Sequence, residues 1–329
     1  MKLFEKRMSS ILTPLTSASA ISRFRDRTHK FELVARDSWF FFVHKDDWFI
    51  KTIRPEDRNL SIAKLNRRMA NSAPGHKKLE LSGVDNFIKS FSKEIKDVIY
   101  MDIGANYGQT AVRIQKILRN LGVKYQIYSF EPGVSADCLA VNVDMNKCEG
   151  VEIFDAAFSD IDGFIPIFAM DGHTEDNKIV NAAKEATVFP VRSIRLDTAC
   201  DAMRSAVNRG SVFFKIDTQG AEVEVLKGAK QIISDHQFLG LLEFSPLSIS
   251  SRIKPAEWLK ELQESMHVIG CDPRQNIKAK VGQSTAEIEA FVDDVISLRM
   301  KFCDIMLVSH NHPKIKLIKT LFEKSGVTL

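Results

Sequence analysis

The sequence has no apolar run near the roughly 20 residues that a membrane-spanning helix needs. The segment from Ile11 to Ala20 contains Pro14 and several Ser and Thr, so it does not resemble the apolar part of a secretory signal. The five cysteines form no CxxC pair, which argues against a zinc site or a disulfide framework and is typical of reduced thiols. We therefore expect a cytoplasmic protein.

An excess of charge of one sign is also missing from most of the chain. The net charge is +4, but seven Lys and Arg and only two acids lie within residues 1–30, so the remaining residues are close to neutral. Such a body does not favour a nucleic acid as partner. Apolar residues at helical spacing alternate with Lys and Arg over residues 2–15. We interpret this segment as a helix that docks on the body or on a second subunit of a homodimer, or makes a weak membrane contact.

The N-terminal part of the chain has different residue patterns from the rest. Three aromatic and β-branched runs, at residues 31–36, 39–44 and 48–53, predict a small hairpin region. A helix is expected at 55–69, and an apolar stripe from Val84 to Ile95 predicts another. We therefore divide the chain into an N-terminal α+β appendage (1–80), a main domain (81–312) and a C-terminal helical tail (313–329).

From Val98 onwards, strands and helices alternate. The strands are expected at 98–102, 125–130, 151–158, 211–216, 238–244 and 303–309, and helices at 110–121, 134–145 and 221–233. This order predicts an α/β fold with a Rossmann-like, doubly wound, mostly parallel sheet. Two further short strands, at 164–169 and 187–195, predict an antiparallel excursion at the ligand edge of that sheet.

A glycine loop follows the first of these strands and precedes a helix. The run Asp102-Ile103-Gly104-Ala105-Asn106-Tyr107-Gly108 has G-x-x-x-G spacing, unlike the G-x-G-x-x-G of dinucleotide binders. Its glycines would let backbone N–H groups approach a ligand. The acid at the strand tip would repel a pyrophosphate and attract a cationic amino acid and a sulfonium. The loop therefore favours S-adenosylmethionine over a nicotinamide cofactor.

The next strand also ends in an acid, in Phe130-Glu131-Pro132. A carboxylate at this tip can accept hydrogen bonds from both ribose hydroxyls. Either motif alone is weak evidence, but the two in series, separated by one helix, predict a site for an adenosyl cofactor.

The chain resembles the FkbM family of S-adenosylmethionine-dependent methyltransferases, which has a class I methyltransferase fold. The matching runs are MDIGANYGQT (101–110), YSFEP (128–132), FDAAFSDIDG (154–163), RLDT (195–198), FFKIDTQGAEVEVLKGA (213–229) and LLEFSP (241–246). The resemblance implies that Asp102, Gly104, Asn106 and Gly108 surround the methionine part, that Glu131 binds the ribose, and that Asp155, Ala156 and Ala157 lie near the adenine. It also implies O-methylation of a hydroxyl, often on a carbohydrate.

One departure from this family pattern concerns the acceptor side. The family usually has D-x-E-G after the strand, whereas this chain has Asp217-Thr218-Gln219-Gly220. If that position contributes a charge to acceptor binding or to a metal, this chain has lost it. The acceptor is therefore less well defined by the sequence than the cofactor.

Transfer to a hydroxyl requires removal of its proton, so a general base or a metal is expected. Asp217, at a strand tip beside the cofactor loop, is the first candidate. Lys215 shares its strand face and must meet a carboxylate or open onto the site, because an unpaired buried ammonium is costly. Glu243 lies near another strand end, and His173 is an alternative base. Asp217 and Glu243 could share a divalent cation, but two acids make a poor site and we do not expect one.

Three other interpretations remain open on the sequence. A nicotinamide-dependent oxidoreductase is disfavoured by the loop spacing and by Asp102. A methyltransferase acting on protein or nucleic acid is disfavoured because Asp217-Thr218-Gln219-Gly220 stands where an Asn/Asp-Pro-Pro-Tyr/Phe motif would be expected. The third interpretation is a cofactor-binding module that has lost catalysis, and the one feature that indicates it is Gln219 in place of the family's usual Glu.

Overall fold

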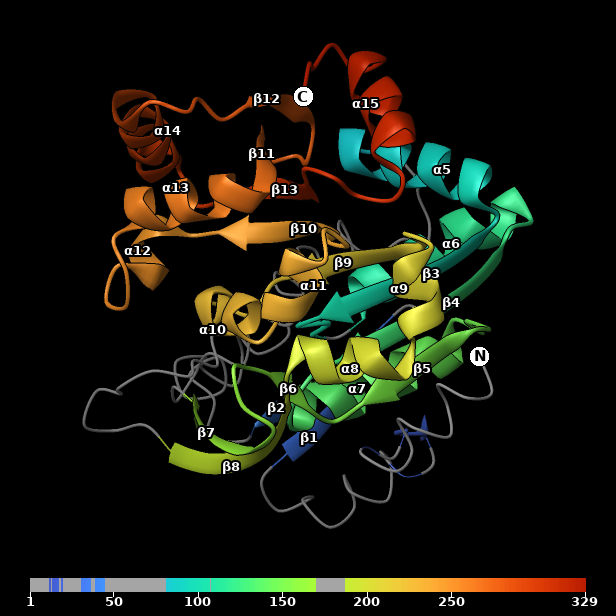
Figure 1. Cartoon of the computed structure of the whole chain (residues 1–329). Coiled ribbons are helices and arrows are strands. Elements are labelled where there is room, and N and C mark those ends of the chain that lie inside the picture. The colour runs from blue at the N-terminus through green and yellow to red at the C-terminus, as the bar shows by residue number, and fades with distance from the viewer. Residues whose placement is uncertain are drawn as a thin grey trace.

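The computed structural model describes residues 12, 14–17, 19, 31–36, 39–44, 81–106, 108–169 and 187–329. Within them, the largest sheet has the order β12-β11-β13-β10-β9-β3-β4-β5 (Figure 1). Its parallel half consists of β5 (Val151–Phe154), β4 (Lys124–Phe130), β3 (Asp97–Ile103), β9 (Val212–Ile216) and β10 (Leu239–Phe244). In its alternating half, β13 (Cys303–Ser309) is antiparallel to both β10 and β11 (Met266–Cys271), and β12 (Ile277–Lys280) is antiparallel to β11. The predicted Rossmann-like α/β fold is confirmed.

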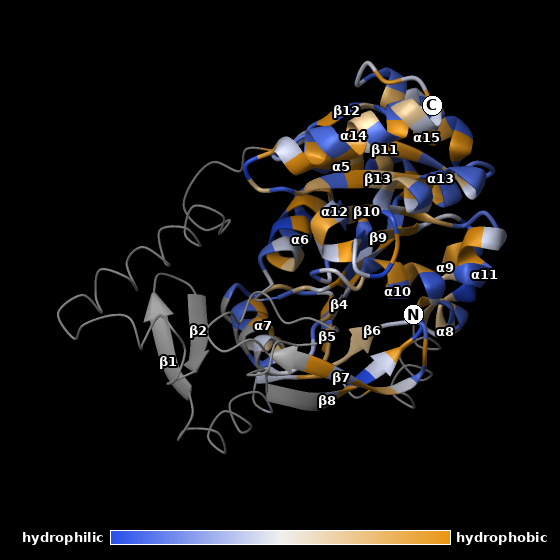
Figure 2. Ribbon diagram, turned by 90° about the vertical axis from the view of Figure 1, so that its left-hand side faces the viewer, coloured by the Kyte–Doolittle hydropathy of each residue, from blue (hydrophilic) through white to orange (hydrophobic). Residues whose placement is uncertain are grey.

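Helices cover both faces of this sheet. Period-two alternation sends Met101 of β3 into one core and Tyr100 into the other, and both side chains are buried. The first core is closed by α8 (Leu196–Ala202), α9 (Arg204–Asn208), α10 (Glu222–Lys227), α11 (Lys230–Ser234), α12 (Pro246–Ile249), α13 (Pro255–Ser265) and α14 (Thr285–Ser297). The second is closed by α5 (Gly83–Ile95), α6 (Gln109–Leu121) and α15 (Ile315–Glu323). Figure 2 shows the helices banded in hydrophobic and hydrophilic residues, as one-sided packing requires.

A three-stranded sheet lies at the end of the molecule opposite β12 (Figures 1 and 2). β7 (Gly163–Ala169) pairs antiparallel with β8 (Thr187–Ile194), and β6 (Ala157–Phe158) pairs parallel with β8. One face buries Ile165, Ile167 and Val191, whereas Phe164 on the other is 66% exposed. The predicted antiparallel excursion is confirmed.

The prediction of one strand over Val151–Phe158 is wrong. The chain leaves the large sheet after Phe154 and joins the small sheet at Ala157. Between them, the Ala156 N–H donates to the Phe154 carbonyl oxygen at 3.0 Å and forms a tight turn, and Asp155 Oδ1 accepts a hydrogen bond of 2.7 Å from the Gly133 N–H. The turn carries the chain from one sheet to the other.

The single helix expected over Ala221–Ile233 is also wrong, because two short helices, α10 and α11, meet there around Gly228. A Cβ at Gly228 would overlap the carbonyl oxygen of Ser159. Asp197 of α8 accepts hydrogen bonds from the N–H groups of Gln231 and Ile232 in α11, at 3.0 and 3.1 Å. The break in the helix is therefore stabilised by a residue far from it in sequence.

In the N-terminal part, β1 (Phe31–Arg36) pairs antiparallel with β2 (Trp39–His44), in agreement with the expected hairpin region. The strand predicted at 48–53, the helix predicted at 55–69 and most of the helix predicted at 2–15 lie outside the described residues. The end of the last prediction is wrong, because Pro14 forms an antiparallel bridge with Phe154 and the Leu15 N–H donates to the Ile153 carbonyl oxygen. The helix α7 (Val134–Met145) and α15 in the tail confirm the helices expected there. The domain boundaries at 80 and 312 stay predictions. In the described part of the chain, no helix combines the length and the apolarity needed to cross a bilayer.

Candidate functional site

A cavity opens at the edge of the sheet where the parallel strands end. The cavity and its open mouth enclose about 700 Å³, part of which is open to solvent. The lining comes from the ends of β3 and β4, from the loops after β3, β4, β5 and β9, from β6 and from one residue of β7: Ile103, Gly104, Asn106, Phe130, Glu131, Pro132, Ala156, Ala157, Phe158, Ile167, Asp217, Thr218 and Gln219. This is the switch point of the doubly wound sheet, where β3 has β4 on one side and β9 on the other.

The glycine turn shapes the cavity differently from the sequence prediction. The amides of Gly104 and Ala105 donate to the Phe130 carbonyl oxygen, at 3.0 and 3.1 Å, so they hold β4 and do not point to a ligand. Gly104 has φ +77°, and a Cβ there would overlap the carbonyl oxygen of Asp217. Gly108, at φ +90°, begins α6. In this structure the glycines therefore bring the ends of β3, β4 and β9 together.

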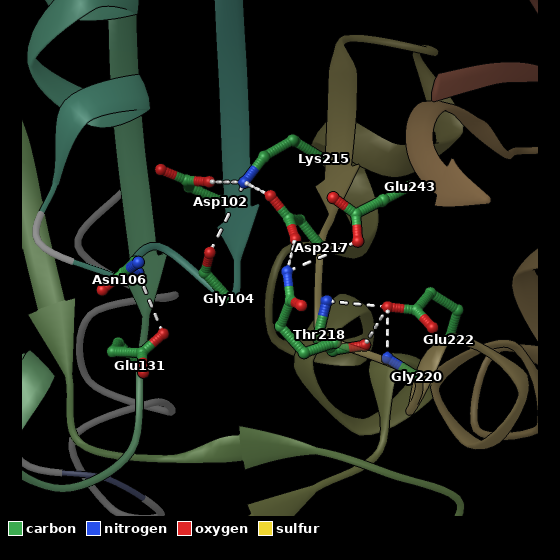
Figure 3. Close-up of polar contacts among 11 residues, drawn as sticks. Asp102, Gly104, Asn106, Glu131, Lys215, Asp217, Thr218, Gly220, Glu222 and Glu243 are labelled. Carbon is green, nitrogen blue, oxygen red and sulfur yellow. Dashed lines mark hydrogen bonds and ion pairs between the residues drawn. The ribbon is translucent and has the colours of Figure 1, made fainter. Parts of the chain in front are cut away.

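Asn106 and Glu131 face each other across the turn (Figure 3). The Asn106 N–H donates to Glu131 Oε2 at 2.9 Å, and Asn106 adopts φ +47°, which Asn tolerates better than most residues. Burial raises the pKa of Glu131 to about 8 despite that hydrogen bond. Asn106 Oδ1 is buried and has no hydrogen-bond partner among the described residues. The cavity therefore presents two oxygen acceptors that a ligand with N–H or O–H groups can satisfy.

Lys215 lies between two acids at the base of the site (Figure 3). Its Nζ is 3.0 Å from Asp217 Oδ2 and 3.6 Å from Asp102 Oδ1. Asp102 is fully buried, and burial raises its pKa although Lys215 opposes the shift. Burial lowers the pKa of Lys215, but Asp217 and Asp102 outweigh it and the net shift is upward. The ammonium therefore stays charged and fixes the Asp217 carboxylate at the cavity wall.

A second group of polar residues extends from Asp217 toward β10. Gln219 Nε2 donates to Asp217 Oδ1 at 3.1 Å and to Glu243 Oε1 at 3.4 Å. Burial, followed by the nearby Asp217, raises the pKa of Glu243. Asp304 of β13 pairs directly opposite Glu243 in the sheet, and burial raises its pKa to about 6. Carboxyl groups thus continue along the sheet edge beyond the cavity.

The structure places the predicted site residues in two shells. Of the candidates, Gly104, Asn106, Glu131, Ala156, Ala157 and Asp217 line the cavity. The others support the lining: Lys215 contacts both Asp217 and Asp102, Glu243 contacts Gln219, Asp155 binds the Gly133 amide, and Gly108 caps α6. His173 lies outside the described residues. Among those described, no group of three His, Cys, Asp or Glu side chains is arranged to hold a metal ion.

Two contributors were not anticipated. Ile167 reaches the cavity from β7, which no local motif indicates. Glu222 is 1% exposed, and its Oε1 accepts the Thr218 and Gly220 N–H groups at 2.9 and 3.1 Å. An acid at the first helical position after a glycine turn is a pattern that indicates such a cap, so Glu222 could have been found from the sequence.

The FkbM methyltransferase domain model matches residues 102–291. No curated protein matches the chain. Among solved structures, similarity is found to the methyltransferase FkbM from Methylobacillus flagellatus KT, with 14% identity and a TM-score of 0.35, covering 84% of this chain and 57% of that one. The present chain thus spans little more than half the length of that protein.

Two further structures are similar at lower identity. The precorrin-6y C5,15-methyltransferase from Geobacter metallireducens GS-15 has 11% identity and a TM-score of 0.29, with coverage of 68% of this chain and 87% of that one. An rRNA methylase from Streptococcus thermophilus has 10% identity and a TM-score of 0.32, with coverage of 70% and 99%. Neither likeness bears on the acceptor of the present protein. The family match, which takes in the glycine turn, both strand-tip acids and the Asp217 loop, shows that the chain belongs to the FkbM methyltransferase family.

Proposed function

We propose that this protein transfers a methyl group from S-adenosylmethionine to a hydroxyl of a sugar, a glycan or another small molecule. The observation that carries the proposal is that two acceptors, the Glu131 carboxylate and the unpartnered Asn106 Oδ1, lie on one wall of the cavity, with Asp217 also in its lining. The two acceptors and the Asp217 carboxylate, which Lys215 holds in place, suit a ligand whose hydroxyl and ammonium groups donate hydrogen bonds.

The residues of the cavity fit S-adenosylmethionine. Glu131 would accept hydrogen bonds from the ribose hydroxyls. The unpartnered Asn106 Oδ1 would accept a hydrogen bond from the amino group of the methionine part. The small and apolar side chains of Ala156, Ala157 and Ile167 would form a surface for the adenine. When bound, the cofactor supplies a methyl group already activated on a sulfonium.

The protein supplies alignment, exclusion of water and a place for the acceptor proton. Lys215 holds the Asp217 carboxylate from below, so that Asp217 can accept the proton of a hydroxyl as the acceptor reacts. Gln219 donates hydrogen bonds to both Asp217 and Glu243, so Glu243 adds a second carboxyl group near Asp217. The near-neutral charge of residues 31–329 supports a small acceptor over a nucleic acid.

Equilibrium binding and turnover test this function together. Isothermal titration of the full chain should show binding of S-adenosylhomocysteine and none of NADH; the reverse result would favour an oxidoreductase. A panel of hydroxylated sugars, with an oligonucleotide and a protein as rival acceptors, is then assayed by mass spectrometry for a product that gains one methyl group. Asp217→Asn should lower kcat by about 10²–10⁴-fold, whereas Asp235→Asn, an exposed control, should not.

A further inference from the structure

Gln219 lies in the loop between β9 and α10, where the sequence departs from the family pattern. Its backbone has φ +54°, in the left-handed region. Three hydrogen bonds to Glu222 Oε1 fix the loop on either side of it: the Thr218 N–H at 2.9 Å, the Thr218 hydroxyl at 3.1 Å and the Gly220 N–H at 3.1 Å (Figure 3). The position of the Gln219 side chain is therefore set by a rigid turn.

The Gln219 amide joins two carboxyl groups that come from different strands. Its Nε2 is 3.1 Å from Asp217 Oδ1 and 3.4 Å from Glu243 Oε1. A primary amide carries two hydrogens, one for each acceptor, and the flipped orientation would turn its carbonyl oxygen toward both of them. Lys215 occupies the other oxygen of Asp217, at 3.0 Å. Asp217 is thus held on both of its oxygens.

Two neighbouring carboxylates in a partly buried site repel each other unless a proton, a cation or hydrogen-bond donors lie between them. Here the donors come from a neutral side chain. A glutamate at the same position would bring a third carboxylate within the same distances and would have no hydrogen to donate when ionised. Three carboxylates so arranged are ligands of the kind that divalent cations bind.

We infer that Gln219 is a positioning residue that takes the place of a bound cation: its amide joins Asp217 to Glu243, so that this site accepts the acceptor proton without a divalent metal. The inference deepens the proposed methyl transfer and rests on it. The proton leaves the acceptor hydroxyl for the Asp217 carboxylate, and the electron pair of the broken O–H bond stays on the acceptor oxygen. The charged or titratable groups around Asp217 and Glu243 are Lys215 of β9, Asp102 of β3, Glu131 after β4, Glu222 of α10, and Cys303 and Asp304 of β13.

Cation binding tests this inference without any assay of turnover. The full chain, Gln219→Glu and Gln231→Glu are titrated with Mn²⁺ by calorimetry. Gln231 is a matched control, because its Nε2 also donates to a carboxylate, Asp235 Oδ1 at 2.7 Å, but on the exposed surface. We expect Gln219→Glu to bind Mn²⁺ at least about tenfold more tightly than the wild type and the control.

Turnover supplies a readout that a purely structural role would not change. Wild-type transfer should be unaffected by EDTA, whereas Gln219→Glu should require Mn²⁺. In Gln219→Leu the Asp217 carboxylate loses one hydrogen-bond donor, so kcat should fall while the KM for S-adenosylmethionine stays unchanged. Gln231→Glu should keep the wild-type kcat and KM.

Several results would overturn the inference. They are saturable Mn²⁺ binding by the wild type that Asp217→Asn abolishes, inhibition of the wild type by EDTA, or a Gln219→Glu variant that matches the wild type in Mn²⁺ affinity. If Gln219→Glu does not fold, the wild-type Mn²⁺ and EDTA experiments still decide. If neither the wild type nor any variant binds S-adenosylhomocysteine, the proposed function fails. The Mn²⁺ titrations still report whether the Gln219 amide takes the place of a cation between Asp217 and Glu243.

Discussion

The central parallel strands β3, β9 and β10 and the alternating strands β11 and β13 are all mostly buried, yet the two sets of strands contain different buried polar groups. In the parallel half, the buried Asp102 and Lys215 form a charged pair at the strand ends. In the alternating half, the buried titratable groups include Cys271 and Cys303, and burial raises the pKa of both thiols, Cys303 to about 12. An ion pair there, Lys278–Asp272, lies at the surface.

The difference follows from strand direction. Parallel strands all end at the same edge, so the loops after β3, β4, β5 and β9 gather there and can surround one ligand. Strands of alternating direction send successive loops to opposite edges, and none of β13, β11 and β12 contributes to the cavity lining. Burial alone therefore does not create a site, whereas shared direction does.

The largest expected effect separates the buried ion pair from the exposed one. Lys215→Met should lower the free energy of unfolding by about 3–5 kcal/mol, because it leaves the fully buried Asp102 without its cation. Lys278→Ala should cost no more than about 1 kcal/mol, because the Lys278 side chain is 62% exposed. Urea denaturation measures both. Equal losses would contradict the comparison, and Asp102→Asn combined with Lys215→Met should recover part of the stability.

A smaller effect is expected at the turn that joins the parallel strands. Gly104 and Gly122 both have positive φ, but a Cβ at Gly104 would overlap the Asp217 carbonyl oxygen, whereas nothing lies within 4 Å of one at Gly122. Gly122→Ala should therefore cost about 1 kcal/mol of backbone strain. Gly104→Ala should cost about 2 kcal/mol or more and weaken S-adenosylhomocysteine binding. Thermal unfolding and calorimetry compare them, and identical behaviour would show that the close approach is unimportant.

The smallest effect concerns the pH dependence of ligand binding. The pKa of Glu131 is raised to about 8 by burial in the ligand-free protein, and ribose hydroxyls favour its ionised form, so binding should release a proton. The affinity for S-adenosylhomocysteine should therefore fall as pH drops below about 8, by up to about tenfold per unit. Glu131→Gln should bind about tenfold more weakly at alkaline pH and lack this slope. Calorimetry over this range measures it, and an equal slope in the variant would assign the proton to another group.

Much of the fold could be predicted because its patterns are local. The alternation of buried strands and helices from Val98 to Phe244 indicates the parallel sheet, and the glycine turn and Glu131 mark two of its strand ends. The prediction that Lys215 and Asp217 share a face is confirmed, since their contact follows from period two within one strand. The role of each residue in catalysis stays a prediction.

Other features depend on packing between segments that are distant in sequence. Asp155, in the turn between the two sheets, binds the Gly133 amide, and Asp197 caps a helix that begins more than 30 residues later. Ile167 lines the cavity because β7, in the small sheet, packs against it. Local periodicity carries no information on such partners.

The amino-acid sequence therefore specifies the sheet, the order of its strand-tip acids and the family, because hydrophobic periodicity and short motifs act over a few residues. The tertiary structure decides how these acids are used. It turns the amides of Gly104 and Ala105 toward Phe130, buries Asp102 beneath Lys215, and brings Glu243 to the amide of Gln219. These arrangements arise only when separate strands pack side by side, since each contact joins groups that come from different strands or loops.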